Sequence, residues 1–326
     1  MIFKCKNCDG NVLYNPEKGT MHCPFCDGLD CEEARPVPDM VMCPNCSGEI
    51  QVMDITSASK CAYCGSYMIF DERVNGEYKP HLILPFKLGK EKVKELIKKE
   101  FKKKIFAPSD FLSEARLSTM EGVYIPFWMY DFTTNMDFQG QGTKVRTGRR
   151  GNKEYTETSY YNVVRNIDTT FDRIPVDASV GMNDEIMDLM EPYDYKKLED
   201  FQEKYMSGFF AEKYGLKAEE LEPRAKQKAV NDSEALFKGT VAGYTTMVPI
   251  SKNLTVTKGE TEYALLPVWI YSYKYKQEVY PFHVNGQTGK IIGKVPISMK
   301  KVWGYTGTVF MIINAIGFLI RGILGV

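Results

Sequence analysis

The chain has 326 residues, of which 44% are apolar and 26% are charged, and its 42 basic and 42 acidic residues cancel. This composition excludes a wholly disordered chain, a collagen-like chain and a polytopic membrane protein. It allows about two soluble domains, since one domain usually takes roughly 100–200 residues. The first six residues contain no apolar run, so we expect no secretory signal peptide and a reducing, cytoplasmic environment.

All nine cysteines lie between Cys5 and Cys64, and eight of them form four C-x-x-C pairs. The pairs are Cys5/Cys8, Cys23/Cys26, Cys43/Cys46 and Cys61/Cys64. The first two pairs and their surroundings superpose on the last two at an offset of 38 residues, which indicates an internal duplication. Two C-x-x-C turns complete a tetrahedron of thiolates about 2.3 Å from a zinc ion. The spacing therefore predicts two closed structural zinc sites, in ribbons at residues 1–36 and 37–70.

Two other uses of cysteine pairs fit the pattern less well. A disulfide framework is typical of secreted mini-proteins, and a redox C-x-x-C comes singly on a βαβ pattern. The ninth cysteine, Cys31, lies between two acidic residues that disfavour its thiolate, so we expect no reactive role for it. His22 adjoins Cys23 and offers another ligand, but the cysteine set is already complete.

Local patterns around the pairs predict the backbone of the ribbons. Gly10, Gly48 and Gly65 follow their pairs closely, where a tight turn needs a residue free to take positive φ. Residues 11–14 and 49–53 alternate apolar and polar, as short strands do.

The charge of the ribbons bears on what they bind. Residues 1–70 carry five basic and nine acidic side chains, and eight thiolates around two zinc ions add further negative charge. Phosphate binding depends on Lys and Arg. We therefore favour protein docking over nucleic-acid binding, with a purely structural cap as the third interpretation.

Positive charge follows the ribbons. Residues 87–105 carry nine lysines and three glutamates, with apolar residues at helical spacing, so they predict an amphipathic helix. Its lysines form either a solvated face over a core-packed stripe or a face toward anionic lipid headgroups. A second basic cluster, at residues 144–153, is typical of a hairpin tip. The candidate membrane or polyanion contacts are Lys94, Lys98, Lys102, Arg149 and Arg150.

Residues 71–300 predict an α+β body with two related strand-hairpin units. Two aromatic stretches share proline, tryptophan and tyrosine at the same relative places: Pro126, Trp128 and Tyr130, and Pro267, Trp269 and Tyr271. We expect each stretch to lead into a glycine-rich turn, at residues 139–144 and 285–290, with antiparallel strands at 155–167 and 271–284. Asn285-Gly286 is a strong hairpin signal.

Helices are expected between the two units. Asn183 or Asp184 is placed to cap a short helix that ends before Pro192, and residues 194–213 and 217–237 also predict helices. The aromatic residues of the body are interpreted as core.

The sequence offers no established catalytic motif. Residues 286–290 resemble a phosphate loop but lack its first glycine and its Ser or Thr, because Val284 and Ile291 stand there. The chain has three histidines and no G-x-S-x-G, H-E-x-x-H or G-x-G-x-x-G. We therefore expect a non-catalytic protein with no evident small-molecule substrate.

The end of the chain, residues 301–326, predicts a membrane anchor. Residues 302–320 carry no charge, close to the roughly 20 apolar residues that span a bilayer. Trp303 and Tyr305 suit the interface, and the preceding Lys300 and Lys301 favour a cytoplasmic amino-terminal side. The alternative is a helix that is buried or lies on a surface.

The duplicated ribbon, GVYIPFWMYD, MNDEIMDLMEPYDY and NGQTGKIIG together resemble a bacterial family of membrane-associated TFIIB-type zinc-ribbon proteins. Members are often labelled by loose similarity to the zinc-binding part of the primosomal replication helicase, a label that does not carry over without a P-loop. The resemblance implies a cytosolic ribbon-bearing body on a C-terminal anchor. It also implies protein partners in flotillin-like or phage-shock-like membrane-stress assemblies.

Two functional hypotheses follow from the sequence. The first is a non-catalytic adaptor on the cytoplasmic membrane, with two structural Zn²⁺ ions, that recruits a protein partner. The alternative is a nucleic-acid-binding replication or transcription accessory that uses the ribbons and the lysine-rich helix.

Overall fold

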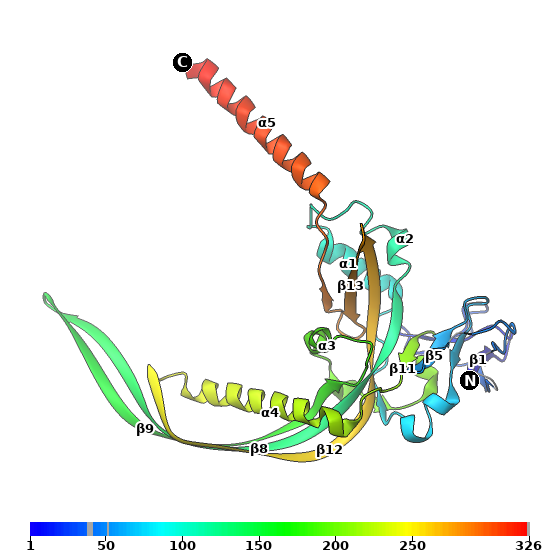
Figure 1. Cartoon of the computed structure of the whole chain (residues 1–326), viewed down its shortest axis with the longest axis horizontal. Helices are drawn as coiled ribbons and strands as arrows, with labels where there is room; N and C mark the ends of the chain where they lie inside the picture. The colour runs from blue at the N-terminus through cyan, green and yellow to red at the C-terminus, as the bar shows by residue number, and fades with distance from the viewer. Residues whose placement is uncertain (38–41, 51, 325–326) are drawn as a thin grey trace.

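The computed structural model describes residues 1–37, 42–50 and 52–324. Residues 38–41 and 51 of the predicted second ribbon, with part of the strand expected at 49–53, lie outside the described residues, as do 325–326 of the predicted anchor. The chain is an α+β protein with two cysteine clusters near its start and an apolar helix at its end, as the sequence predicts (Figure 1).

Ten of the described strands form one sheet around two long central strands, β8 (Glu121–Arg150) and β12 (Thr246–Tyr275). The path across the sheet is β10 (Glu199–Asp200), β7 (Leu82–Ile83), β12, β8, β11 (Phe210–Glu212), β5 (Thr56–Lys60) and β6 (Tyr67–Ile69). Off this path, β9 (Lys153–Asp177) pairs with β8, and β13 (Glu278–Asn285) pairs with β12 and β14 (Ile291–Gly293).

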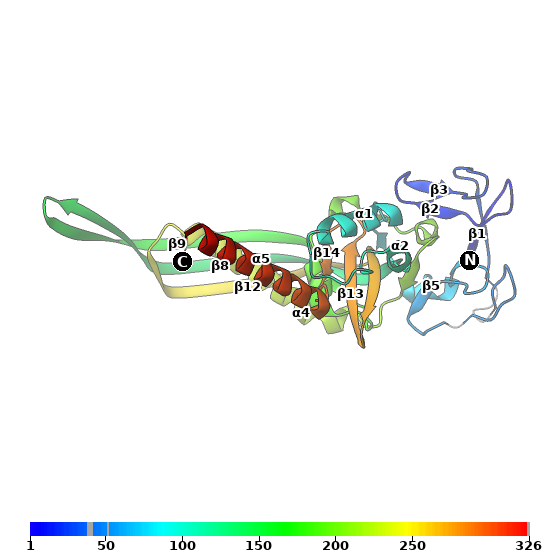
Figure 2. The ribbon, with the colours of Figure 1, turned by 90° about the horizontal axis from the view of Figure 1, so that it is seen from above.

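The strand pair β5–β6 belongs to the predicted second ribbon, yet it extends the sheet of the body through β11. The first ribbon instead carries two small antiparallel pairs of its own (Figure 2). These pairs are β1 (Ile2–Cys5) with β4 (Glu32–Arg35), and β2 (Leu13–Asn15) with β3 (Thr20–His22).

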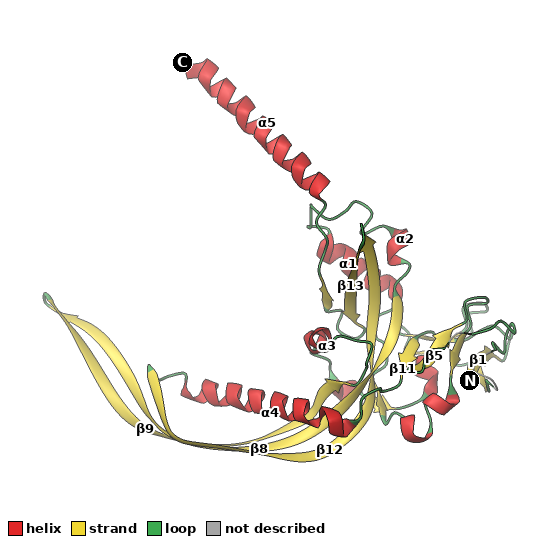
Figure 3. Ribbon diagram, viewed as in Figure 1, coloured by secondary structure: helices red, strands yellow, loops and turns green. Residues whose placement is uncertain are grey.

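β8, β9 and the first part of β12 leave the body together as a long curved arm (Figure 3). The turn expected at residues 139–144 is wrong, because β8 continues to Arg150 and the chain reverses at Gly151, with φ +64°. Gly140 and Gly142 serve close packing: a Cβ on either would lie 2.6 Å from the ring of Phe138 or Tyr244, respectively. The basic cluster at 144–153 does form the tip of this hairpin, as expected.

All the described helices except the last lie against the body, and the last projects from it (Figure 1). The helices are α1 (Lys90–Phe101), α2 (Glu114–Leu117), α3 (Asp184–Met190), α4 (Ala218–Val241) and α5 (Met299–Leu324). The amphipathic α1 is confirmed, since Val93, Ile97 and Phe101 are buried. The Asn183 cap of α3 is confirmed too, because its side chain accepts a hydrogen bond from the amide of Ile186.

The helix expected at residues 194–213 is wrong. The segment instead contains the short strands β10 and β11 and the 3-10 turns η3 (Tyr195–Lys197) and η4 (Glu203–Met206); two further 3-10 turns, η1 (Asp71–Arg73) and η2 (Gly76–Tyr78), precede β7. Gly208, with φ +101°, breaks any helix, and Phe210 then pairs in parallel with Val123 of β8. Tertiary pairing has overridden the Glu- and Lys-rich local pattern.

The two halves of the body repeat the order strand, helix, long strand, hairpin partner. β7, α1, β8 and β9 form the first half, and β11, α4, β12 and β13 form the second. β8 and β12 pair antiparallel with Ile125 opposite Leu266, and β11 lies beside β8 as β7 lies beside β12. This arrangement agrees with the prediction of two related strand-hairpin units. That the two units arose by duplication stays a prediction.

Candidate metal centres and surfaces

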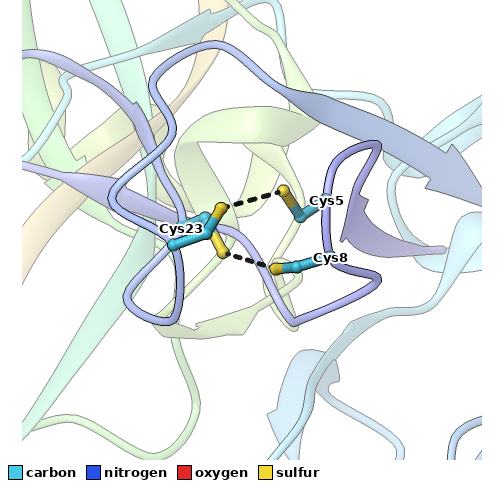
Figure 4. Close-up of side chains that lie close together, drawn as sticks. Cys5, Cys8 and Cys23 are labelled. Carbon is cyan, nitrogen blue, oxygen red and sulfur yellow. Dashed lines mark hydrogen bonds between the residues drawn. The ribbon is translucent and has the colours of Figure 1, made fainter.

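The first cysteine group comes from two knuckles of the first ribbon. The ligand sulfurs of Cys5, Cys8, Cys23 and Cys26 all lie within 4.8 Å of one another. The Cys5–Cys26 and Cys8–Cys23 sulfur distances are 3.6 and 3.5 Å, and Figure 4 shows Cys5 and Cys8 facing Cys23 across the gap between the two turns.

The second group repeats this geometry. Cys43, Cys46, Cys61 and Cys64 lie within the same 4.8 Å limit, with sulfur distances of 3.6 Å for Cys43–Cys64 and 3.7 Å for Cys46–Cys61. A tetrahedron of sulfurs 2.3 Å from a metal has edges of about 3.8 Å, whereas a disulfide needs about 2.05 Å. Both groups therefore fit a tetrahedral metal ion, and the structure brings the eight predicted cysteines together in two sets of four.

The backbone of the knuckles explains how the thiols converge. In the first knuckle the amide of Cys5 donates to the carbonyl of Gly10 and the amide of Asp9 to the carbonyl of Cys5. Positive φ falls on the residue directly after each pair: Asp9, Asp27, Ser47 and Gly65. The expectation is therefore right for Gly65 and wrong for Gly10 and Gly48, because Asp and Ser tolerate the left-handed region there.

Gly10 and Gly48 have a different role, which was not predicted from the sequence. A Cβ on Gly10 would lie 2.5 Å from the ring of Phe25, and one on Gly48 would lie 2.5 Å from the ring of Tyr63. Each ring packs over the glycine of the opposite knuckle, yet 73% of each aromatic residue stays exposed. The signal was available, since both residues precede the last cysteine of their ribbon at the 38-residue offset.

The ninth cysteine touches the first centre. Cys31 is buried, and its sulfur lies 3.3 Å from that of Cys5. Its hydrogen bond with Cys5, together with burial, raises the pKa of the Cys31 thiol to about 11. Burial opposes ionisation of Cys5, but hydrogen bonds from the Asn7 amide and from Cys31 outweigh it and lower the Cys5 pKa to about 6. Cys31 therefore lies beside the ligand set as a hydrogen-bond partner of one ligand sulfur, that of Cys5.

The candidate basic contacts divide into two kinds. Lys94 is buried, with its ammonium 2.8 Å from Glu91 and 2.6 Å from Glu114, and Lys98 bonds to the same Glu114 at 2.8 Å. These bonds from Lys94 and Lys98 lower the pKa of Glu114 to about 2. The interpretation of Lys94 as a surface contact is wrong, because its charge is neutralised inside the fold.

The remaining predicted basic contacts are exposed. Lys102 follows the end of α1, and Arg149 and Arg150 lie at the arm tip beyond the last residue that pairs with β12, Thr143. They are not brought to one site by the fold, since the arm and α1 lie on different parts of the body (Figure 1).

The helix α5 is the candidate membrane element. Its segment Met299–Ile320 is long and apolar enough to cross a membrane, and none of that stretch is buried against the rest of the protein.

The chain is 34% identical, over 335 residues, to uncharacterized protein YdjG of Bacillus subtilis (strain 168), and the match covers 98% of each chain. The chain belongs to the YdjG family. No protein-family model and no solved structure matches it. The match extends over nearly the whole chain and so is not confined to the cysteine-rich residues 1–70.

Proposed function

We propose that the chain is a non-catalytic adaptor with two structural zinc ions in TFIIB-type ribbons, anchored to the cytoplasmic membrane by α5 and recruiting a protein partner through the ribbons. The observation that carries the proposal is the repeated exposure of Phe25 and Tyr63. Exposed aromatic residues on a rigid support are the residue type that dominates protein interfaces.

The rigidity of the support comes from the cysteine groups. Each aromatic residue lies between two metal-ligand cysteines, so a bound ion fixes its backbone on both sides. Two equivalent anchors on one chain allow bivalent capture of a repeated or elongated partner. The excess of acidic side chains in residues 1–70 favours a partner with a basic surface.

The position of α5 supports a membrane location. The helix projects alone from the body, away from the ribbons (Figure 1), so a membrane at α5 and a protein at the ribbons could be bound at the same time. Exposed Trp303 and Tyr305 lie in its first turns, after Lys300 and Lys301, which favours a cytoplasmic body. The resemblance to membrane-associated ribbon proteins adds flotillin-like or phage-shock-like proteins as candidate partners.

The docking role is tested by pull-down of the full chain from solubilised membranes. We expect Phe25→Ala combined with Tyr63→Ala to lose the partner while it keeps two zinc equivalents. The matched control is Tyr160→Ala in the arm, an exposed aromatic residue of similar exposure (68%), which should retain the partner. A partner kept by the double variant would exclude the ribbon rings as the docking surface.

The anchor is tested separately by fractionation. Removal of residues 302–326 should move the protein from the membrane pellet to the soluble fraction. Equal pelleting of the truncated chain would contradict the anchor without touching the docking role.

Nucleic-acid binding is the second candidate, and the exposed arm tip favours it. Lys144, Arg146, Arg149, Arg150 and Lys153 gather there beside exposed Tyr155. Binding of this kind should weaken steeply with salt. No binding of single or double strands at low salt would remove this candidate.

A further inference from the structure

A hollow of about 720 Å³ lies where the body meets α5. One wall is the loop that follows α1, at residues 103–107, and the other is the segment at 293–297 that leads from β14 to α5. We call it the juxtamembrane pocket. It is distinct from the metal centres. Two of its lysines, Lys103 and Lys104, end the lysine-rich segment at 87–105, and the third, Lys294, comes from the other end of the body.

The pocket is fixed in place relative to α5. The amide of Ser298 donates to the carbonyl of Phe106 at 2.8 Å, and the ring of Phe106 lies edge-on to that of Tyr305, with centroids 5.6 Å apart. Tyr305 is in the second turn of α5, so one wall of the pocket is packed against the start of the helix. A membrane that holds α5 would therefore meet this pocket at its headgroup layer.

The charge of the pocket is positive and available. Lys103, Lys104 and Lys294 line it against a single acid, Glu100. All three lysines are exposed, and among the described residues no carboxylate lies within 4.0 Å of their ammonium groups. Lys94 and Lys98 of α1, in contrast, are neutralised by glutamates.

The walls of the pocket also carry large aliphatic side chains that are exposed to solvent. Ile105 is 58% exposed and Ile297 is 60% exposed, and both line the pocket beside the lysines. A free phosphate would gain nothing from these groups. An amphiphile with a phosphate at its head and hydrocarbon directly below would contact both kinds of side chain.

We propose that the juxtamembrane pocket binds the headgroup of an anionic phospholipid, with Lys103, Lys104 and Lys294 around the phosphate and with Ile105 and Ile297 against the glycerol and upper acyl chain. The inference rests on the proposed membrane anchoring and deepens it by naming the lipid class. Lysines near a membrane surface favour anionic over zwitterionic lipid.

The test uses the detergent-solubilised full chain with phosphatidylglycerol or phosphatidylcholine added, and native mass spectrometry to count retained lipid. We expect retention of phosphatidylglycerol, little phosphatidylcholine, and at least a roughly tenfold loss in the triple variant Lys103→Gln/Lys104→Gln/Lys294→Gln. The matched control, Lys197→Gln/Lys226→Gln/Lys238→Gln, removes the same charge from exposed lysines elsewhere and should bind as the parent does.

The outcomes separate the sources of binding and the two proposals. Equal retention by pocket and control variants, or equal retention of both lipids, would overturn the pocket, as would full displacement of phosphatidylglycerol by excess inorganic phosphate. Both variants should keep two zinc equivalents and the parent's thermal unfolding, which excludes misfolding as the cause. Fractionation of the parent in cells tests the anchor independently. A parent protein that is soluble in cells but still retains phosphatidylglycerol in detergent would contradict the membrane anchor and leave the lipid-binding pocket supported.

Discussion

The two halves of the body share the same order of elements but differ in the length of their hairpins. Trp128 of β8 donates its indole N–H to the carbonyl of Leu216, just before α4, and Trp269 of β12 donates to Leu88, just before α1, each at 3.0 Å. Each long strand is thus tied to the helix of the other half. The difference lies in the hairpins: β9 makes a long arm of the first half, whereas β13 stops after a short hairpin. One scaffold therefore supports a compact end and a projecting one.

The ends of the two hairpins sharpen the comparison. Asp177 ends β9 as Asn285 ends β13, and in both halves the next amide donates to a proline carbonyl of the long strand, Pro126 or Pro267, at 2.9 Å. Both side chains are fully buried. Asn285 donates to the carbonyls of Met190 and Pro192 and accepts two amides, whereas Oδ2 of Asp177 has no hydrogen-bond partner among the described residues.

The largest expected effect concerns the pH dependence of stability in Asp177→Asn. Burial raises the pKa of Asp177 from 3.8 to about 7, so between these values the folded state holds a proton that the unfolded state has lost. The free energy of unfolding of the parent should therefore fall with rising pH across this window, by about 4 kcal/mol in total, and level off above it. Chemical unfolding at a series of pH values measures the free energy of unfolding of parent and variant, and the difference between the two curves isolates the contribution of Asp177.

The reciprocal change, Asn285→Asp, gives the control for that prediction. It should introduce a similar fall with pH into the second half. Parallel pH profiles for the parent and Asp177→Asn would show that the two hairpin ends are not in contrasting environments.

The second effect is the loss of stability in Asn285→Ala, which removes the side chain whose hydrogen bonds are all formed. The change breaks its hydrogen bonds and leaves buried carbonyls and amides without partners, so we expect a loss of about 3 kcal/mol. Asp177→Ala should cost far less, since that carboxyl is only partly satisfied. Chemical unfolding of both variants at one pH compares the losses of stability. Equal losses would show that the two side chains do not differ in how fully they are hydrogen-bonded.

A smaller and symmetric effect is expected for the tryptophans. Trp128→Phe and Trp269→Phe each keep a ring but lose one hydrogen bond to a carbonyl, so each should cost about 1 kcal/mol. Clearly unequal losses in thermal unfolding would show that the halves do not share the same tie between strand and helix.

The smallest effect on stability is expected at the arm tip. Replacement of residues 145–158 by Asn-Gly would close the hairpin near Thr143, where pairing with β12 ends. Nearly all of the removed side chains are exposed, so unfolding should change by less than about 1 kcal/mol. A large loss of stability would mean that the arm tip contributes to the fold rather than serving only as a surface.

The two cysteine groups that fit a metal ion were predictable because their sequence signal is local. Four C-x-x-C pairs at equal spacing define the ligands without knowledge of the fold, and the duplication doubles the signal. The exposed rings of Phe25 and Tyr63 could have been inferred from the same alignment of the two ribbons. The burial of Lys94 could not, because Glu114, one of its two partners, comes from another helix across a loop.

The errors share a physical cause. Residues 194–213 have helical composition, but Phe210 and Ala211 pair with β8, which is distant in sequence. Gly140 and Gly142 suggested a turn, yet a Cβ there would lie 2.7 Å from the carbonyl oxygen of Val248 or 2.6 Å from the ring of Tyr244, both far along the chain. Non-local contacts of this kind decide both cases, and local patterns carry no record of them.

The exchange of neighbours between the halves bears on how the protein is made. β7 pairs with β12, and Phe237 of α4 packs against Phe138 of β8. Because α4 ends at Val241 and β12 at Tyr275, the first half of the body gains α4 first and the strand beside β7 only after most of β12 has been synthesised. Until then the apolar side chains of β8 that these neighbours cover stay exposed, and exposed apolar surface makes a partly folded chain prone to aggregation. The chain order places β12 before the apolar helix α5, so the sheet of the body can close before that helix has been fully synthesised.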